Sequence, residues 1–102
     1  MKACCKEYMA EQFGDDADII ADIYGEYVTS VGEKIAETHS ALAAKDWGLL
    51  DRIAHTIKGN ALAVGDNDMA ETAIALRKTS TLNDETGSAE LIAKLEEFRT
   101  LL

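Results

Sequence analysis

The sequence predicts an all-α fold, an antiparallel four-helix bundle with a short additional N-terminal helix. Apolar residues recur at spacings of three, four and seven along most of the chain, which is the period of an amphipathic helix. The chain has no proline and 6% aromatic residues, while alanine, leucine, glutamate and lysine are plentiful. This composition favours helix over sheet. With 102 residues, a single domain covering 1–102 is expected.

The N-terminal part is expected to form at least two helices. A short helix over 5–13 ends at Gly14, and a long apolar stripe follows over 16–44, as one helix or as two with a bend. The stripe contains Ile20, Tyr24, Val28, Val31, Ile35 and Leu42. His39 lies only about 40° from this stripe in helical projection, which predicts a structural histidine rather than a reactive one.

Three more helices are expected in the rest of the chain. One covers 47–64, with Asp46 as its N-cap and Gly65 as its end. The next begins at 66–68, and the polar segment 79–87 is interpreted as a loop. The inward residues of this next helix are Met69, Ala73 and Leu76. A last helix over 88–102 is expected to bury Leu91, Leu95, Phe98 and Leu102.

The helix over 47–64 carries a histidine on its polar side. Its apolar stripe consists of Leu50, Ile53, Ala54, Ile57, Ala61 and Val64. His55 lies about 140° from the centre of this stripe, so it should face solvent. Gly59, one turn later, leaves no side chain over the edge of the ring, although glycine in a helix costs about 0.5–1 kcal/mol relative to alanine. We infer that something large approaches His55.

Two charged residues flank this histidine. Lys58, at i+3, can place an ammonium near an anion carried on His55, and Asp51, at i−4, can accept a hydrogen bond from the ring Nδ1–H. Such a bond would leave the lone pair on Nε2, facing outward. A nucleophilic nitrogen, a nearby cation and an open approach together indicate phosphoryl transfer onto His55.

The segment 54–59, with Val64 and Gly65 ending the same helix, resembles the signature of histidine-containing phosphotransfer (HPt) domains. The segment 44–47 falls where that family has a turn, and the inward residues after the motif fall at its core positions, so the resemblance covers nearly the whole chain. It implies a phosphorelay intermediate in which His55 is the phosphoacceptor and Lys58 stabilises the phosphoryl group.

The resemblance also implies the partners. The phosphoryl group would come from the phospho-aspartate of a receiver domain and pass to another receiver aspartate. The partners would be response-regulator receiver domains and a hybrid sensor kinase. The magnesium ion of the reaction would belong to the receiver, and this chain would need no cofactor. Leu62, about 120° from the core stripe, is expected to be exposed and to dock the receiver.

Two residues depart from the family pattern. Asn60 stands where many members have serine, and either side chain can hydrogen-bond phosphate or water. Arg77 stands where the related domains of chemotaxis kinases have a glutamate that bonds Nδ1 of the imidazole. Arginine cannot accept that bond, so the ring would be oriented by Asp51, a backbone oxygen or water, and Arg77 would add positive charge near the phosphoryl group.

Charge and motifs exclude several function classes. A net charge of −9 argues against nucleic acid and anionic membranes as partners. No apolar run approaches the roughly 20 residues of a membrane span, and no secretory signal is visible, so a cytoplasmic monomer is expected. The chain has no Glu-x-x-His pair and no glycine-rich phosphate loop, hence no metal site and no kinase activity of its own are expected. Cys4 and Cys5 are interpreted as ordinary thiols packed by the first helix.

Three other interpretations stay open. The chain could be the phosphoacceptor segment of a larger chemotaxis-type kinase, a bundle that binds a receiver as a non-phosphorylated inhibitor or adaptor, or a structural adaptor with a coincidental motif. Arg77 and the start at Met1 argue against the kinase segment. Phosphorylation of His55 would separate the carrier from the other two.

Overall fold

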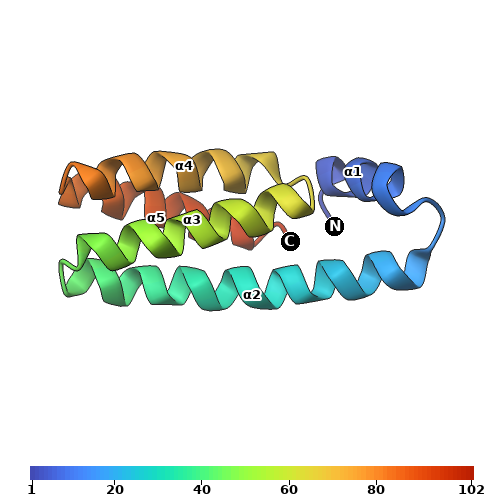
Figure 1. The fold of residues 1–102 in the computed structure, drawn as a ribbon, viewed down its shortest axis with the longest axis horizontal. Helices are drawn as coiled ribbons and strands as arrows, with labels where there is room; N and C mark the ends of the chain where they lie inside the picture. Colours follow the sequence, from blue (N-terminus) through green and yellow to red (C-terminus); the bar gives the residue numbers. More distant parts are fainter.

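The computed structural model describes residues 1–102 and contains five helices and no strand. The helices are α1 (Ala3–Phe13), α2 (Ala17–Ala43), α3 (Trp47–Ala63), α4 (Asn67–Thr81) and α5 (Glu85–Arg99). Helices α2 to α5 form an antiparallel bundle in which each packs on the next and α5 also packs on α2 (Figure 1). Helix α1 lies beside the N-terminal part of α2 at one end. The predicted four-helix bundle with an additional N-terminal helix is confirmed.

The three turns of the bundle share one design. In each turn a residue with left-handed φ is followed by an aspartate that caps the next helix. The left-handed residues are Lys45, Gly65 and Asn83, with φ of 53°, 74° and 54°. The caps are Asp46, Asp66 and Asp84, and each carboxylate accepts the backbone N–H three residues later. These tight turns keep consecutive helices antiparallel and side by side.

Helix α3 lies between α2 and α4 and contributes a continuous apolar stripe to the core. The residues predicted for this stripe, Leu50, Ile53, Ala54, Ile57, Ala61 and Val64, are all buried. Full burial of a leucine or isoleucine side chain stabilises the fold by about 1.5–3 kcal/mol. The orientation of α3 about its axis is therefore fixed, and its opposite edge faces solvent.

The loop predicted over 79–87 is wrong in extent. Helix α4 continues to Thr81, and α5 begins at Glu85. The hydroxyls of Thr79, Ser80 and Thr81 donate hydrogen bonds to carbonyl groups of the preceding helical turn. The hydroxyl groups of these side chains thus have hydrogen-bond partners inside the helix. The polar composition of the segment alone did not indicate this.

The buried face of α5 also differs from the expected one. Leu95 is fully buried as predicted, and Ile92 beside it is buried as well. Leu91, Phe98 and Leu102 are only half-buried, and the helix ends at Arg99. The helix packs on α4 and α2 through a face rotated toward Ile92, so the predicted stripe lies at the edge of the contact.

His39 is exposed, in contrast to its predicted place near the apolar stripe of α2. Thr38 takes the buried position at this level of the bundle. The His39 side chain is 55% exposed, and its Nε2 lies 3.1 Å from Oε1 of Glu96 on α5. The residue contributes a surface contact between α2 and α5 and is not grouped with His55.

A buried carboxylate holds α1 on the bundle. Asp66 is fully buried, and its Oδ1 accepts a hydrogen bond from Nζ of Lys2 at 2.8 Å. Its Oδ2 accepts one from the Tyr27 hydroxyl at 2.6 Å. One carboxylate at the start of α4 therefore binds the residue before α1 and a residue of α2. Breaking one side of a buried ion pair typically costs about 3–5 kcal/mol.

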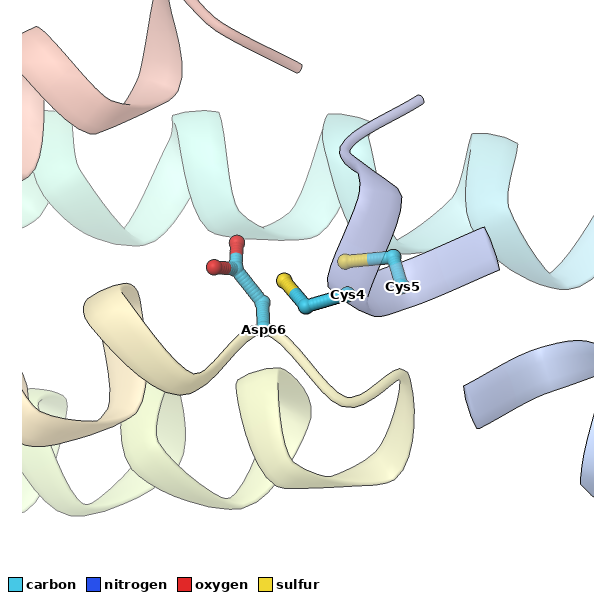
Figure 2. Close-up of side chains that lie close together, drawn as sticks. All are labelled: Cys4, Cys5 and Asp66. Atoms are coloured by element: carbon cyan, nitrogen blue, oxygen red, sulfur yellow. The ribbon is translucent and has the colours of Figure 1, made fainter. Parts of the chain in front are cut away.

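Both cysteines of α1 face the same carboxylate (Figure 2). The two thiol sulfurs and a carboxylate oxygen of Asp66 lie within 4.8 Å of one another, which is the one grouping of metal-ligating atoms in the chain. Asp66 already accepts hydrogen bonds at both oxygens, however, and burial together with its charge raises the pKa of the Cys5 thiol to about 12. The thiols are free, as predicted, and Cys5 packs as a neutral group.

The buried Cys5 thiol should make the fold sensitive to alkali. Its pKa is raised from 9.0 to about 12, so above about pH 9 the folded chain retains a proton that the unfolded chain loses. The free energy of unfolding should fall as the pH rises past this point, by at most about 1.4 kcal/mol per pH unit from this group. Urea denaturation between about pH 8 and about pH 10 measures the decline.

The variant Cys5→Ala is the control for this decline. It should flatten the slope most clearly up to about pH 9, because Tyr24 and Tyr27, whose folded pKa values are also raised by burial, ionise appreciably in the unfolded chain only as the pH approaches about 10. An equal slope in Cys5→Ala would show that the thiol is not the source.

Candidate functional site

Helix α3 presents His55 to solvent. The side chain is exposed, while its neighbour Ala54 and the nearby Ile57 are fully buried. The backbone under the histidine is therefore anchored in the core, and only the ring projects from the bundle. This is the placement that the helical period predicts.

Gly59 leaves one side of the ring open. A Cβ built at this position would meet no atom within 4 Å, so the fold itself does not require glycine here. Lys58, the residue before it, is half-buried and forms no salt bridge. An approaching group thus finds an uncovered ring edge and an ammonium without a partner.

A shallow groove runs between α3 and α4 beside this edge. Its lining residues are Asp51, Lys58, Ile74, Arg77, Lys78 and Thr81. Three of the ten lysine and arginine residues of the chain gather here, although the net charge is −9. The groove is therefore a locally cationic surface, which suits a phosphoryl group or another anion.

Arg77 connects the groove to the histidine. Its Nε donates a hydrogen bond to Oδ1 of Asp51 at 3.0 Å, and its Nη1 lies 3.0 Å from Nδ1 of His55. The expected hydrogen bond from the ring to Asp51 is therefore wrong. The planar guanidinium reaches both groups from α4, so Asp51 acts on the ring only through Arg77.

Asn60 does not join the site. It follows His55 by five residues, which places it about 140° further round α3, and its Nδ2 donates a hydrogen bond to Oγ of Ser30 on α2 at 3.1 Å. The expected contact between Asn60 and a phosphoryl group is not supported. The side chain instead links α3 to α2.

Two apolar side chains on α3 and α4 are exposed, and one of them, Ile74, lines the groove. Leu62 on α3 is 48% exposed, as predicted, and Ile74 on α4 is 50% exposed. Ile74 and Lys78 were not singled out from the sequence. Ile74 lies three residues before Arg77 and four before Lys78, and this helical spacing was the signal that could have placed the three side chains together.

None of the five helices combines the length and hydropathy that crossing a bilayer requires.

A family model described as "Hpt domain" matches residues 22–102, which includes α3, α4 and α5 and most of α2. No curated protein matches the chain, and no solved structure does. The matched region contains every residue of the groove, while α1 precedes it.

Gly59→Ala should make the chain more stable. The added Cβ meets nothing within 4 Å, and alanine is favoured over glycine in a helix by about 0.5–1 kcal/mol. Urea denaturation should show this gain. Gly65→Ala is the matched control and should lose stability, because its φ is +74° and the new Cβ would clash with Cβ of Tyr8. A loss of stability in Gly59→Ala would mean that the helix needs glycine here for its own packing.

Proposed function

The chain belongs to the Hpt domain family, and we propose that it is a phosphorelay carrier that works through His55. Hpt domains perform histidine phosphotransfer in two-component signalling, in contact with receiver domains and kinases. The observation that carries the proposal is the exposed His55 at the edge of a cationic groove in the matched region.

The transfer has two steps. Nε2 of neutral His55 attacks the phosphorus of a receiver phospho-aspartate, the N–P bond forms, and the P–O bond breaks to release the aspartate carboxylate. A carboxylate oxygen of a second receiver then attacks the phosphorus, and the N–P bond breaks to return His55. The magnesium ion belongs to the receiver in both steps, and this chain supplies no cofactor.

Lys58 supplies the positive charge for the phosphoryl group. It is one turn from His55, lines the groove and has no carboxylate partner to neutralise it. A lysine in this setting acts as a point charge on a flexible stem, so it can follow the phosphoryl group between donor and acceptor.

The receiver docks on the face that surrounds the histidine. Gly59 allows close approach, and the exposed Leu62 on α3 and Ile74 in the groove offer apolar contacts. Apolar anchors at the centre of an interface contribute most of the binding energy. The same face would meet each receiver in turn, including that of a hybrid sensor kinase.

One copy of the chain suffices for this function. His55, Lys58 and Arg77 come from two neighbouring helices of the same molecule, so we propose a monomeric carrier in the cytoplasm, where receiver domains operate. The chain has no glycine-rich phosphate loop for a nucleotide, hence it depends on a separate kinase.

The variant His55→Gln tests the site. Wild-type chain incubated with phosphorylated receiver domains should gain acid-labile, base-stable phosphate, and His55→Gln should gain none while its helicity is retained. His39→Gln is the matched control, because these are the two histidines of the chain, and it should be labelled like wild type. Normal labelling of His55→Gln would show that the phosphoacceptor lies elsewhere.

The same assay separates the alternatives. Receiver binding without labelling of the wild type would indicate an inhibitor or adaptor. Labelling by an ATP-dependent kinase domain, but by no receiver, would indicate the phosphoacceptor segment of a chemotaxis-type kinase.

Lys58→Ala should slow phosphoryl acceptance by about tenfold, which corresponds to about 1.4 kcal/mol of lost transition-state stabilisation. The rate is measured by rapid quenching with the fastest receiver donor. Lys94→Ala, which removes an exposed charge from α5, should leave the rate unchanged. Equal effects of both variants would mean that net charge, and not the position of Lys58, matters.

A further inference from the structure

The contact between Arg77 and His55 determines where the imidazole proton lies. A guanidinium has five N–H donors and no acceptor. Because Nη1 of Arg77 lies 3.0 Å from Nδ1 of His55, that nitrogen must present its lone pair. The neutral ring then carries its proton on Nε2, and a protonated Nε2 has no lone pair with which to attack phosphorus.

We propose that Arg77 is a positioning residue that slows both gain and loss of the phosphoryl group at His55. Its hydrogen bond to Nδ1 of His55 is here called the lock. The inference rests on the proposed function and concerns the rate at which this site exchanges phosphate. Arg77 holds the ring in the tautomer that is unreactive at Nε2, and a carboxylate at the same position would hold the opposite one.

Asp51 keeps the lock in place. Its Oδ1 accepts the Nε–H of Arg77 at 3.0 Å, so one guanidinium contacts the carboxylate and the ring through different nitrogens. The two side chains are only about one-third exposed, at 37% and 34%. Arg77 is thus held on both sides and is not a freely moving surface arginine.

Arg77 opposes the attack on phosphorus. When the Nε2 lone pair forms the N–P bond and the aspartate leaves, the ring becomes positively charged and carries its proton on Nδ1. That proton would point at the guanidinium, so a donor would face a donor and two positive charges would lie side by side. Before attack, the Nε2 proton must pass to water, Nδ1 must take one from water, and Arg77 must turn away from the ring.

Arg77 also opposes loss of the phosphoryl group. Once Nε2 is bonded to phosphorus, the ring can release its Nδ1 proton to water, and the freed lone pair again accepts a hydrogen bond from Arg77. The N–P bond breaks more readily when Nδ1 is protonated, because the leaving group is then neutral imidazole rather than an anion. By occupying Nδ1, Arg77 prolongs the life of phosphohistidine.

The lock and a simple charge role predict rate changes of opposite sign when Arg77 is removed. If Arg77 only stabilised the transferred phosphoryl group, its removal would slow acceptance by His55. If it locks the ring, its removal speeds acceptance and also shortens the life of the product. Lys78 is the natural control, because it lines the same groove with the same charge but has no hydrogen bond to the ring.

The tautomer is measured directly by ¹⁵N NMR of the His55 ring in the unphosphorylated chain. The proton should lie on Nε2 in the wild type and move to Nδ1 in Arg77→Glu, whose carboxylate can only accept. Lys78→Glu should keep the wild-type pattern. A proton on Nδ1 in the wild type, or no shift in Arg77→Glu, would overturn the lock. This result does not depend on whether any receiver transfers phosphate to the chain.

The rates are measured with phosphoramidate as the donor, so that no partner protein is needed; its P–N bond breaks and ammonia leaves. Arg77→Ala should accept phosphate faster and lose it faster, each by about threefold to tenfold. Lys78→Ala, which removes a cation from the groove but no hydrogen bond to the ring, should accept phosphate no faster than the wild type. Slower acceptance by Arg77→Ala would overturn the lock in favour of a charge role. Circular dichroism verifies the fold, and Arg77→Gln replaces the alanine variant if that variant is unfolded.

Discussion

The orientation of α3 about its own axis is the constraint on which the site depends. Its buried stripe contacts the core between α2 and α4, and Leu50 and Ile57 on this stripe are fully buried. A rotation of the helix by one residue would turn these side chains toward solvent and draw His55 inward, at a cost of several kcal/mol. The fold thereby holds an exposed ring on a rigid support, which phosphoryl transfer requires because the donor must reach the ring from outside.

The positive charge of the groove contrasts with the net negative charge of the molecule. The chain has a net charge of −9, yet Lys58, Arg77 and Lys78 meet at one groove. The surrounding negative charge repels polyanions, whereas the groove has the positive charge that a single small anion would need. Asp51 forms an ion pair with Arg77, whereas Lys58 has no carboxylate partner. Arg77 and Lys58 therefore have separate tasks.

Helical periodicity predicts correctly the features of α3 that depend on that helix alone, whereas the buried face of α5 and the exposure of His39 differ from what it predicts. The exposure of His55 and Leu62, the open side at Gly59 and the Asp46 cap all follow from spacing within a segment. Contacts between helices do not follow from spacing, because they depend on which faces meet. For this reason the Arg77 bridge between Asp51 and His55, and the pairing of Asn60 with Ser30, became visible only in the structure.

The same limit explains Asp66 and the end of α4. Asp66 caps α4 at the predicted start of that helix, but its burial depends on Lys2 and Tyr27, which are distant in sequence. The serine and threonine residues at 79–81 are typical of loops, yet here they bond to the carbonyls of their own helix. A polar composition indicates exposed backbone only when the side chains have no partner nearby.

Position 77 shows how a rigid bundle can adjust reactivity without changing its fold. The residue lies at the partly exposed edge of α4, where an acceptor and a donor can both be accommodated without disturbing the core. An acceptor there places the proton on Nδ1 and frees Nε2, whereas a donor does the reverse. Lys58 would serve transfer in either case, because it acts on the phosphoryl group and not on the ring. In the proposed mechanism the rate of exchange and the stabilisation of the phosphoryl group are therefore controlled by different residues, and each can change while the other is kept.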